Sequence, residues 1–388
     1  MKQTEIGLIP DDWEVKTLGE IGEPCMCKRI LKEQTSSTGD VPFYKIGTFG
    51  GIPDAFISRE LFEQYKEQYN YPKKGTLLLS AAGTIGRVVV FDGKDSYFQD
   101  SNIVWIDNDE TKVTNDFLFY CYSRMQWKTE EGGIVSRLYN ANLKSTSFIA
   151  PKSLAEQQRI AKALSDVDAL ISTTEKLIQK KKNIKQGAMQ NLLTGKKRLP
   201  GFAKSTTYKQ TELGPIPEDW EVKSLGEMLK IGHGKDYKNL KSGNVPVYGT
   251  GGYMTSVNDF LYEGETVCIG RKGTIDKPQY HSGKIWTVDT LFYTYDFKSL
   301  NPKYLFYKFC LIDWLSMNEA SGVPSLTAKN IEDIKITIPT EEEQTAIANV
   351  LSSMDKEIEI LNTKLEKYRN LKTAMMQQLL TGKIRLVK

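Results

Sequence analysis

An internal repeat constrains the fold of this chain more than any other feature of its sequence. The string QTEIGLIPDDWEVKTLGEI, which starts at Gln3, returns as QTELGPIPEDWEVKSLGEM at Gln210, an offset of 207 residues. A longer string starts at Glu156 and returns at Glu343, an offset of 187 residues, and its two copies end in LLTGKKRL and LLTGKIRL. Self-similarity of this kind is typical of chains built from copies of one unit. The sequence therefore predicts two copies of a leading segment, an insert and a long exit segment.

The two inserts, around 22–150 and 229–338, are predicted to be mixed α/β. The first insert is about twenty residues longer, because the offset falls from 207 to 187 across it. Short β-branched and aromatic runs bounded by Gly, Asp and Lys predict strands; these runs are TLLLSAAG, RVVVF, NIVWI, ETVCIG, KIWTV and TLFYTY. Two apolar segments predict helices, NDFLFYCYSRM from Asn115 and a second from Asn301, where Asn301 is the N-cap and Pro302 the first helical residue.

The exit segments are predicted to be long helices with a coiled-coil seam, because apolar residues recur at alternating intervals of four and three. In the first copy the seam weakens towards its end; its positions are Ile160, Leu164, Val167, Ile171, Thr174, Ile178, Lys181, Lys185, Ala188 and Leu192. In the second copy one lysine interrupts it, and the positions are Ile347, Leu351, Met354, Ile358, Leu361, Leu365, Tyr368, Lys372, Met375 and Leu379.

Both helices carry start and stop signals. A capping box opens each one, Ser153-x-x-Glu156 and Thr340-x-x-Glu343, and a glycine, Gly195 or Gly382, closes it. A helix of about 40 residues spans roughly 60 Å, so it is a spacer. Two equal helices with apolar seams are expected to pack antiparallel and to hold the inserts at opposite ends. Periodicity alone leaves open that the helices only serve oligomerisation.

These elements predict an α/β (α+β) chain with two mixed α/β domains separated by antiparallel helices in a pseudo-two-fold, cyclic arrangement. The 388 residues exceed the ~250 to 300 at which single cores stop growing. The expected parts are a first insert domain, spacer helix 1, a linker, a second insert domain and spacer helix 2, at 1–152, 153–199, 200–209, 210–339 and 340–388.

Composition leaves the partner open. The 52 Lys and Arg residues against 48 Asp and Glu residues give a net charge of +4, so any affinity for nucleic acid must come from local patches. Apolar runs of about 18 residues and a signal-like N-terminus are both absent, so a cytoplasmic protein that does not enter a membrane is expected. Five scattered cysteines fit a reducing compartment, and the lone Cys25-x-Cys27 lacks a second pair for zinc.

Familiar catalytic patterns are missing. Each Gly-Lys pair lacks the following Ser or Thr of a phosphate-binding loop, and two histidines are too few for triads or His-rich metal sites. The repeated Glu-Val-Lys at Glu14 and Glu221 resembles a nuclease string but lacks acidic partners. Asn301-Pro302-Lys303-Tyr304 resembles a methyltransferase loop without its second proline, and a helix start explains it better. We therefore predict no catalytic residue and no metal site.

Each insert does contain a Gly-rich basic turn after a strand, residues 80–87 and 270–275, and a later polar segment, residues 133–144 and 322–330. Glycines in such places are often plain turn residues, but these turns recur at matching places in divergent inserts. Backbone N–H groups and cations in such turns can approach phosphates, and Arg, Lys and Asn pair with phosphates and base edges. The predicted DNA-binding residues are Thr84, Arg87, Arg137, Tyr139, Asn142, Lys144, Arg271, Lys272, Thr274, Ser325 and Lys329.

The paired G-x-I-P-x-D-W and E-Q-x-x-I-A-x-x-L strings, in this order around variable inserts, resemble the DNA-specificity subunit of type I restriction-modification systems over essentially the whole chain. The resemblance implies two target-recognition domains that each read one half of a split, asymmetric site in double-stranded DNA. It also implies a subunit without catalysis, held with two modification subunits on its helices and, in the full assembly, two restriction subunits. The helix residues expected to mark the partner-binding surface are Ile160, Leu164, Ile171, Ile347, Leu351 and Ile358.

The same resemblance places every cofactor on partners: S-adenosylmethionine on the modification subunits, with ATP and Mg²⁺ needed for restriction, and none on this chain. Two other classes remain open from the residues alone. One is a self-contained methyltransferase or nuclease with unrecognised motifs. The other is a stand-alone coiled-coil scaffold or DNA-binding regulator without methyltransferase partners.

Overall fold

The computed structural model describes residues 1–127, 137–203, 207–318 and 320–387, which form two compact units. Unit 1 contains Met1–Thr173 and Leu365–Lys388, and unit 2 contains Thr174–Lys364. The units therefore divide both long helices internally, whereas the repeat alone suggested domain ends at 152 and 339. In the described ranges, no helix is both long enough and apolar enough to cross a membrane.

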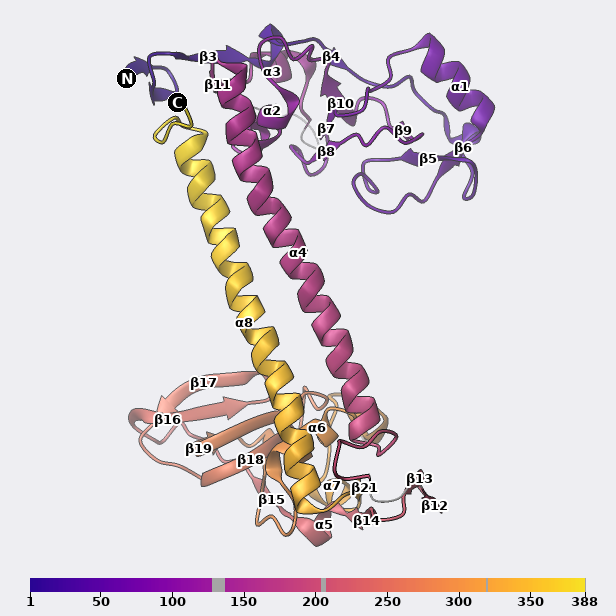
Figure 1. Ribbon diagram of the computed structural model, residues 1–388, viewed down its shortest axis with the longest axis vertical. Helices are drawn as coiled ribbons and strands as arrows, with labels where there is room; N and C mark the ends of the chain where they lie inside the picture. The colour runs from indigo at the N-terminus through magenta and orange to yellow at the C-terminus, as the bar shows by residue number, and fades with distance from the viewer. Residues whose placement is uncertain (128–136, 204–206, 319, 388) are drawn as a thin grey trace. The chain divides into compact units, whose positions relative to one another are not determined.

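Unit 1 carries the first leading segment and the first insert (Figure 1). Its sheets have the strand orders β1-β2, β11-β3, β4-β10-β7-β8 and β6-β5-β9. The strands are β1 (Lys2–Thr4), β2 (Gly7–Ile9), β3 (Trp13–Thr17), β4 (Pro24–Cys25), β5 (Val41–Tyr44), β6 (Phe56–Ile57), β7 (Leu77–Ser80), β8 (Val88–Val90), β9 (Tyr97–Phe98), β10 (Ile103–Ile106) and β11 (Ser147–Pro151). The helices are α1 (Arg59–Gln68), α2 (Asn115–Tyr122) and α3 (Asn140–Ser145), with short 3-10 turns at Leu18–Glu20 and Lys32–Gln34.

Unit 2 repeats this frame around a larger sheet of order β15-β20-β18-β19-β16-β17, beside the pairs β12-β13 and β14-β21. The strands are β12 (Tyr208–Thr211), β13 (Gly214–Pro217), β14 (Glu221–Ser224), β15 (Lys230–His233), β16 (Ser242–Gly249), β17 (Gly252–Val257), β18 (Tyr262–Gly270), β19 (Gln279–Thr287), β20 (Leu291–Tyr295) and β21 (Lys335–Ile338). The helices are α5 (Leu225–Met228), α6 (Pro302–Phe309) and α7 (Ala328–Glu332), with a 3-10 turn at Trp314–Met317.

The sequence-based strands and helices of the inserts are confirmed. All six predicted runs contain a strand. Asn301 caps α6 as expected, because its side chain accepts hydrogen bonds from the N–H groups of Lys303 and Tyr304 and Pro302 takes the first helical position. The helix is shorter than the apolar run suggested and ends at Phe309, after which a separate 3-10 turn begins at Trp314.

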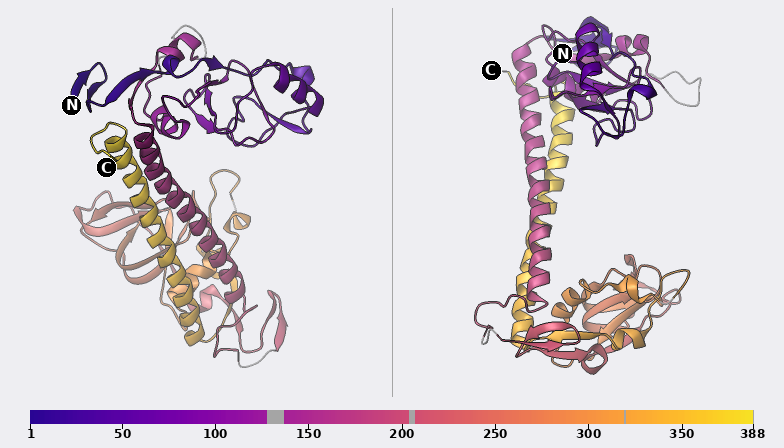
Figure 2. Two further views of the ribbon diagram at one scale, coloured as in Figure 1. Left: turned by 45° about the horizontal axis from the view of Figure 1, so that its top comes forward. Right: turned by 90° about the vertical axis from the view of Figure 1, so that its right-hand side faces the viewer.

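The two exit segments form α4 (Leu154–Leu192) and α8 (Glu341–Leu379), and every predicted seam position is buried or half-buried. Within each unit the two helices run antiparallel: the first turns of α4 lie beside the last turns of α8 in unit 1 (Figure 2), and the reverse holds in unit 2. The lysines that interrupt the seam have partners in these pairs. Lys372 forms an ion pair with Asp168 at 2.6 Å, and Lys185 pairs with Asp355.

The same contacts recur on both seam aspartates. The hydroxyl of Tyr120 donates to Asp168 at 2.9 Å in unit 1, and the hydroxyl of Tyr307 donates to Asp355 at 2.7 Å in unit 2. Each aspartate thus joins a tyrosine from the insert to a lysine from the other long helix. The seam therefore contains polar contacts as well as apolar ones, and these contacts connect each insert to both helices.

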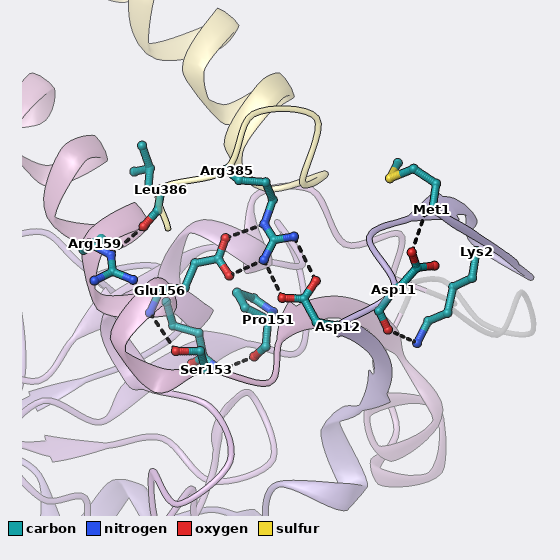
Figure 3. Close-up of polar contacts among 11 residues, drawn as sticks. Met1, Lys2, Asp11, Asp12, Pro151, Ser153, Glu156, Arg159, Arg385 and Leu386 are labelled. Carbon is teal, nitrogen blue, oxygen red and sulfur yellow. Dashed lines mark hydrogen bonds and ion pairs between the residues drawn. The ribbon is translucent and has the colours of Figure 1, made fainter. Parts of the chain in front are cut away.

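An arginine clasp closes each unit. In unit 1 the guanidinium of Arg385, just after α8, donates to both carboxylates of Asp12 and Glu156 at 2.6 to 2.8 Å (Figure 3). Beside this clasp, Arg159 on α4 donates to the carbonyl of Leu386. In unit 2 Arg198 contacts Asp219 and Glu343 in the same way at 2.6 to 2.9 Å. Within each unit, the tail that follows one long helix is thereby bonded to a leading segment and to the start of the other long helix.

The arginine clasp corrects one of the two hydrogen bonds that were predicted for each capping box. The hydroxyl of Ser153 does accept a hydrogen bond from the N–H group of Glu156, at 3.4 Å. The carboxylate of Glu156, however, binds Arg385 and not the start of its own helix, and the carboxylate of Glu343 likewise binds Arg198. A buried carboxylate gains more from a guanidinium with two parallel hydrogen bonds than from one amide N–H.

The neighbouring glutamines fix the insert on the helix. The amide of Gln157 accepts from the N–H of Thr114 and donates to the carbonyls of Lys112 and Pro151. Gln344 makes the equivalent three bonds to Asn301, Ser299 and Pro339 in unit 2. The Glu-Gln pair at the start of each exit segment therefore joins the helix tail and the insert to the same helix turn.

The closing glycines are confirmed with an added reason. Gly195 and Gly382 have φ values of 72° and 68°, the left-handed conformation that favours glycine. A Cβ at Gly195 would lie 2.6 Å from Pro217, and one at Gly382 would lie 2.5 Å from Pro10. Each glycine thus lets the helix tail turn and lets it approach the leading segment closely.

Candidate nucleic-acid interface

The Gly-rich turn and the later polar segment of each insert meet in the structure. In unit 1 an isolated antiparallel bridge joins Ala82 to Arg137, and the N–H of Leu138 donates to the carbonyl of Ala81 at 2.9 Å. In unit 2 the bridge joins Lys272 to Ser325, and the N–H of Leu326 donates to Arg271 at 2.9 Å. We call each pair a bridged turn. Residues 133–136 of the predicted first segment lie outside the described residues.

A third segment completes both bridged turns. The N–H of Ala81 donates to the carbonyl of Asn102, and the N–H of Arg271 donates to the carbonyl of Thr290, in both cases at 2.8 Å. These bonds align the two inserts position by position, so that Asn102 corresponds to Thr290. The inserts differ in length and sequence, yet they share one hydrogen-bonded frame.

The cations stand on opposite sides of this shared frame. Unit 1 has Ala81 and Ala82 on the turn and the exposed Arg137 opposite them. Unit 2 has the exposed Arg271 and Lys272 on the turn, and the half-buried Ser325 takes the place of Arg137. Two surfaces with the same backbone but differently placed cations would contact the phosphates of a nucleic-acid helix at different positions. Cations that contact phosphates fix the position of a domain on a duplex and do not by themselves select a sequence.

The other residues predicted on the turns are placed as follows. Thr84 is exposed and Thr274 half-buried. Arg87 is exposed, and its Nη1 donates to the carbonyl of Phe49 at 2.9 Å, which holds the guanidinium against the adjacent loop. Arg271 has a weaker anchor, a 3.3 Å bond from Nη1 to the carbonyl of Asp289. All four thus belong to the bridged turns or to their edge.

A groove adjoins each bridged turn. In unit 1 it has a volume of about 720 Å³ and brings Arg29, Lys45, Gln99 and Asn102 next to Arg137. In unit 2 it has a volume of about 670 Å³ and brings His233 and Thr290 next to Arg271, Lys272 and Ser325. Both grooves are lined by cations and neutral hydrogen-bonding side chains, and also by carboxylates, Asp54 and Asp100 in unit 1 and Asp289 in unit 2.

Several of these residues were missed by sequence reasoning, namely Arg29, Lys45, Gln99, Asn102, His233 and Thr290. They come from five separate chain segments, and no motif joins them. One available signal was a polar residue directly before a buried strand, Asn102 before β10 and Thr290 before β20. Such a residue lies at a strand end, where side chains reach solvent while the backbone remains fixed.

The remaining predicted contacts lie on α3 and α7 or at their starts. Tyr139 precedes α3 and is 51% exposed. Asn142 is half-buried, and its carbonyl accepts hydrogen bonds from Ser145 and Thr146. Lys144 forms an ion pair with Glu23 at 2.8 Å, and Lys329 pairs with Asp333 at 2.7 Å. The two lysines already have carboxylate partners, so they are weaker candidates for phosphate contacts than the cations of the bridged turns.

The six helix residues expected to mark the partner surface need a correction. Ile160, Leu164, Ile347 and Leu351 are at most 1% exposed and belong to the cores of the two units. Ile171 and Ile358 are half-buried. An apolar seam is satisfied first by the chain's own helices, so these four side chains cannot touch another subunit.

Other apolar residues of α4 do remain at the surface. Leu170, Leu177 and Ile184 recur every seven residues and are 45%, 39% and 47% exposed. A spacing of seven places them on one face of the helix. Leu170 belongs to unit 1, and Leu177 and Ile184 belong to unit 2.

Three comparisons relate the chain to known proteins. The profile of the family described as the type I restriction modification DNA specificity domain matches residues 10–186 and 217–368. A putative type I restriction enzyme specificity subunit of Haemophilus influenzae is 58% identical over 160 residues, which cover 41% of this chain and 41% of that protein. The putative MjaX specificity subunit of Methanocaldococcus jannaschii is 29% identical over 432 residues, covering 99% of this chain and 96% of that protein.

The solved structures agree in fold. The S subunit of a type I restriction-modification system from M. genitalium superimposes with a TM-score of 0.64 at 17% identity and covers 98% of both chains. At this identity the likeness concerns the architecture alone. It shows that two inserts and two long helices are shared along the full length.

Proposed function

Because the chain belongs to the type I restriction-modification DNA specificity family, we propose that its two bridged turns contact the two halves of a split DNA site. The chain is a DNA-specificity subunit without catalysis of its own. The observation that carries the proposal is the shared frame with exchanged cations at Arg137 and at Arg271 and Lys272. Cations on a fixed backbone supply phosphate contacts that position each unit on DNA, and the unlike side chains of the two grooves allow the two halves to be different.

Membership of the family implies DNA and the modification and restriction subunits of a type I system as partners. We further propose two modification subunits, which carry S-adenosylmethionine and methylate adenine, and two restriction subunits that use ATP and Mg²⁺. The duplicated build supports this number, since each unit offers the same helix pair once. The exposed side chains of Leu177 and Ile184 are the proposed contact on α4 in unit 2. We also propose that the assembly acts in the cytoplasm.

Methylome sequencing tests the split site directly. A cell that expresses the chain with its modification partner is expected to carry methylated adenines at one bipartite motif whose two halves differ in sequence. The physical reason is that the two grooves present different side chains on one frame. A palindromic motif, or no motif that depends on this chain, would contradict the proposal. Deleting only this gene, with the partner genes left intact, is the control.

The cation of the second bridged turn gives a second test. Arg271→Ala is expected to weaken binding to a duplex that contains the motif, and to reduce the slope of log affinity against log salt by about 0.9, the value for one lost phosphate contact. Fluorescence anisotropy between about 50 and 200 mM salt measures the slope. Lys329→Ala is the matched control, because Lys329 already pairs with Asp333. An Arg271→Ala protein with unchanged affinity at every salt concentration would remove this turn from the interface.

A further inference from the structure

The loop between β9 and β10 in unit 1 is held rigidly beside the bridged turn. The N–H of Gln99 donates to the carbonyl of Tyr44 at 2.9 Å, and the N–H of Ile103 donates back to the carbonyl of Gln99 at 3.1 Å. The carbonyl of Asn102 accepts from Ala81. The backbone of Asn102 is therefore fixed to the Gly-rich turn on one side and to the sheet on the other.

This loop also contains backbone strain. Ser101 has a φ of 60°, in the left-handed region that non-glycine residues seldom adopt. Such strain persists only where the surrounding structure holds it, and it gathers at functional sites. The strained residue directly precedes Asn102, so it determines where that side chain is presented.

The neighbouring polar side chains of the loop are occupied internally. The Oε1 of Gln99 accepts from the N–H of Ile46 at 2.9 Å. Asp100 forms an ion pair with Arg29 at 2.9 Å, and the hydroxyl of Ser101 donates to Asp100. In contrast, the side-chain amide of Asn102 has no hydrogen-bond partner among the residues that the structure describes. It lines the groove beside Arg137, and within the described ranges both its donor and its acceptor are without a partner.

From this placement we propose that Asn102 reads the edge of an adenine in the half-site that unit 1 contacts. The inference rests on the proposed DNA-binding surface and adds a specificity residue to it. Asparagine offers one donor and one acceptor, which match the N7 acceptor and N6 donor of adenine in the major groove. Guanine offers two acceptors there and suits arginine instead. Arg137 lines the same groove and can contact a phosphate beside the neutral amide, whereas Arg29 and Lys45 already pair with Asp100 and Asp54.

Unit 2 offers the internal comparison. Thr290 holds the position equivalent to Asn102 and lines the corresponding groove. Its single hydroxyl cannot make the paired donor and acceptor contact. The two half-sites are therefore read by different chemistry at one shared position of the frame.

The experiment is methylome sequencing with Asn102→Ala and Asn102→Asp in the full chain with its modification partner. Both variants are expected to make one A·T position of one half-site degenerate, with about a 10-fold loss of discrimination there. The other positions and the other half-site should stay as in the parent. Asn102→Asp keeps the side-chain size and removes the donor, so it separates lost recognition from lost packing. Thr290→Ala, as the matched control, should affect only the other half-site.

Two outcomes would overturn the inference. One is an unchanged motif in both Asn102 variants. The other is an equal loss at all positions of the half-site in Asn102→Asp, which would assign Asn102 to backbone positioning. Arg137→Ala separates this from failure of the proposed surface. If Arg137→Ala weakens DNA binding while the Asn102 variants keep the motif, only the adenine contact is wrong. If Arg137→Ala also has no effect, the surface itself is wrong.

Discussion

Arg198→Ala is expected to lower the free energy of unfolding of unit 2 by about 3 to 5 kcal/mol, the range for removing one partner of a buried ion pair. The side chain of Glu343 is 1% exposed and that of Arg198 is 6% exposed, so the variant leaves a carboxylate without its cation inside the protein. The indole N–H of Trp220 also donates to this carboxylate, at 3.2 Å, but cannot neutralise it. Urea unfolding combined with amide hydrogen exchange, which reports each unit separately, measures the effect.

The equivalent arginine provides the control. Arg385→Ala is expected to affect unit 1 and by a smaller amount, because the side chain of Arg385 is 24% exposed and water can take over part of its role. The double variant Arg198→Met with Glu343→Gln should recover much of the loss, since a neutral pair leaves no buried charge. If Arg198→Ala and the double variant were equally unstable, lost packing and not the unpaired carboxylate would be the cause.

Lys308 is expected to make the stability of unit 2 depend on pH between about 7 and 10. Burial lowers the pKa of Lys308 from 10.5 to about 7, and its Nζ donates to the carbonyl of Leu193 at 2.8 Å and the hydroxyl of Thr337 at 2.9 Å. Above pH 7 the folded protein holds the neutral amine while the unfolded chain still binds a proton. Stability therefore rises with pH, by up to about 1.4 kcal/mol per pH unit, and this contribution is lost as pH falls to 7.

Urea unfolding at several pH values from 7 to 9 tests this. Lys308→Met should remove the slope, so that the difference between variant and parent changes by about 2 to 3 kcal/mol across this range. Lys308→Cys is the matched variant, because Cys121 holds the same position in unit 1, one residue after the tyrosine that bonds the seam aspartate. Parallel pH curves for the parent and Lys308→Met would show that Lys308 stays charged in the folded protein.

Much of the architecture could be predicted because it depends on local patterns that occur twice. The 4,3 spacing marks the seam of α4 and α8 whatever it packs against, and Gly195 and Gly382 mark the helix ends because a left-handed turn favours glycine. Asn301 and Pro302 define the start of α6 through chemistry within one turn. Each of these signals involves neighbours in sequence, so the sequence contains them completely.

The candidate site could be predicted only in part. The Gly-rich turns and Arg137 were found because they recur or lie in a polar segment, whereas Asn102 gave no such signal. The placement of Asn102 depends on Ala81, which directly follows β7, and on Arg137 in a distant segment. Hydrophobic periodicity does not show which strand ends lie next to each other in the fold. Because the two inserts also differ in sequence, the repeat does not reveal the residues that line the groove.

The sequence by itself determined a duplicated α/β chain with two long helices and two unlike inserts, since propensity, capping and periodicity act over a few residues. The tertiary structure decided which partners each charged side chain meets. Glu156 looked like a cap for its own helix, yet it binds Arg385 at the far end of the chain. The seam residues Ile160 and Ile347 looked available to partners, yet they are buried in the chain's own cores. In both cases burial is the reason: once water is removed, a carboxylate needs a cation and an apolar side chain needs a neighbour, and only folding supplies them.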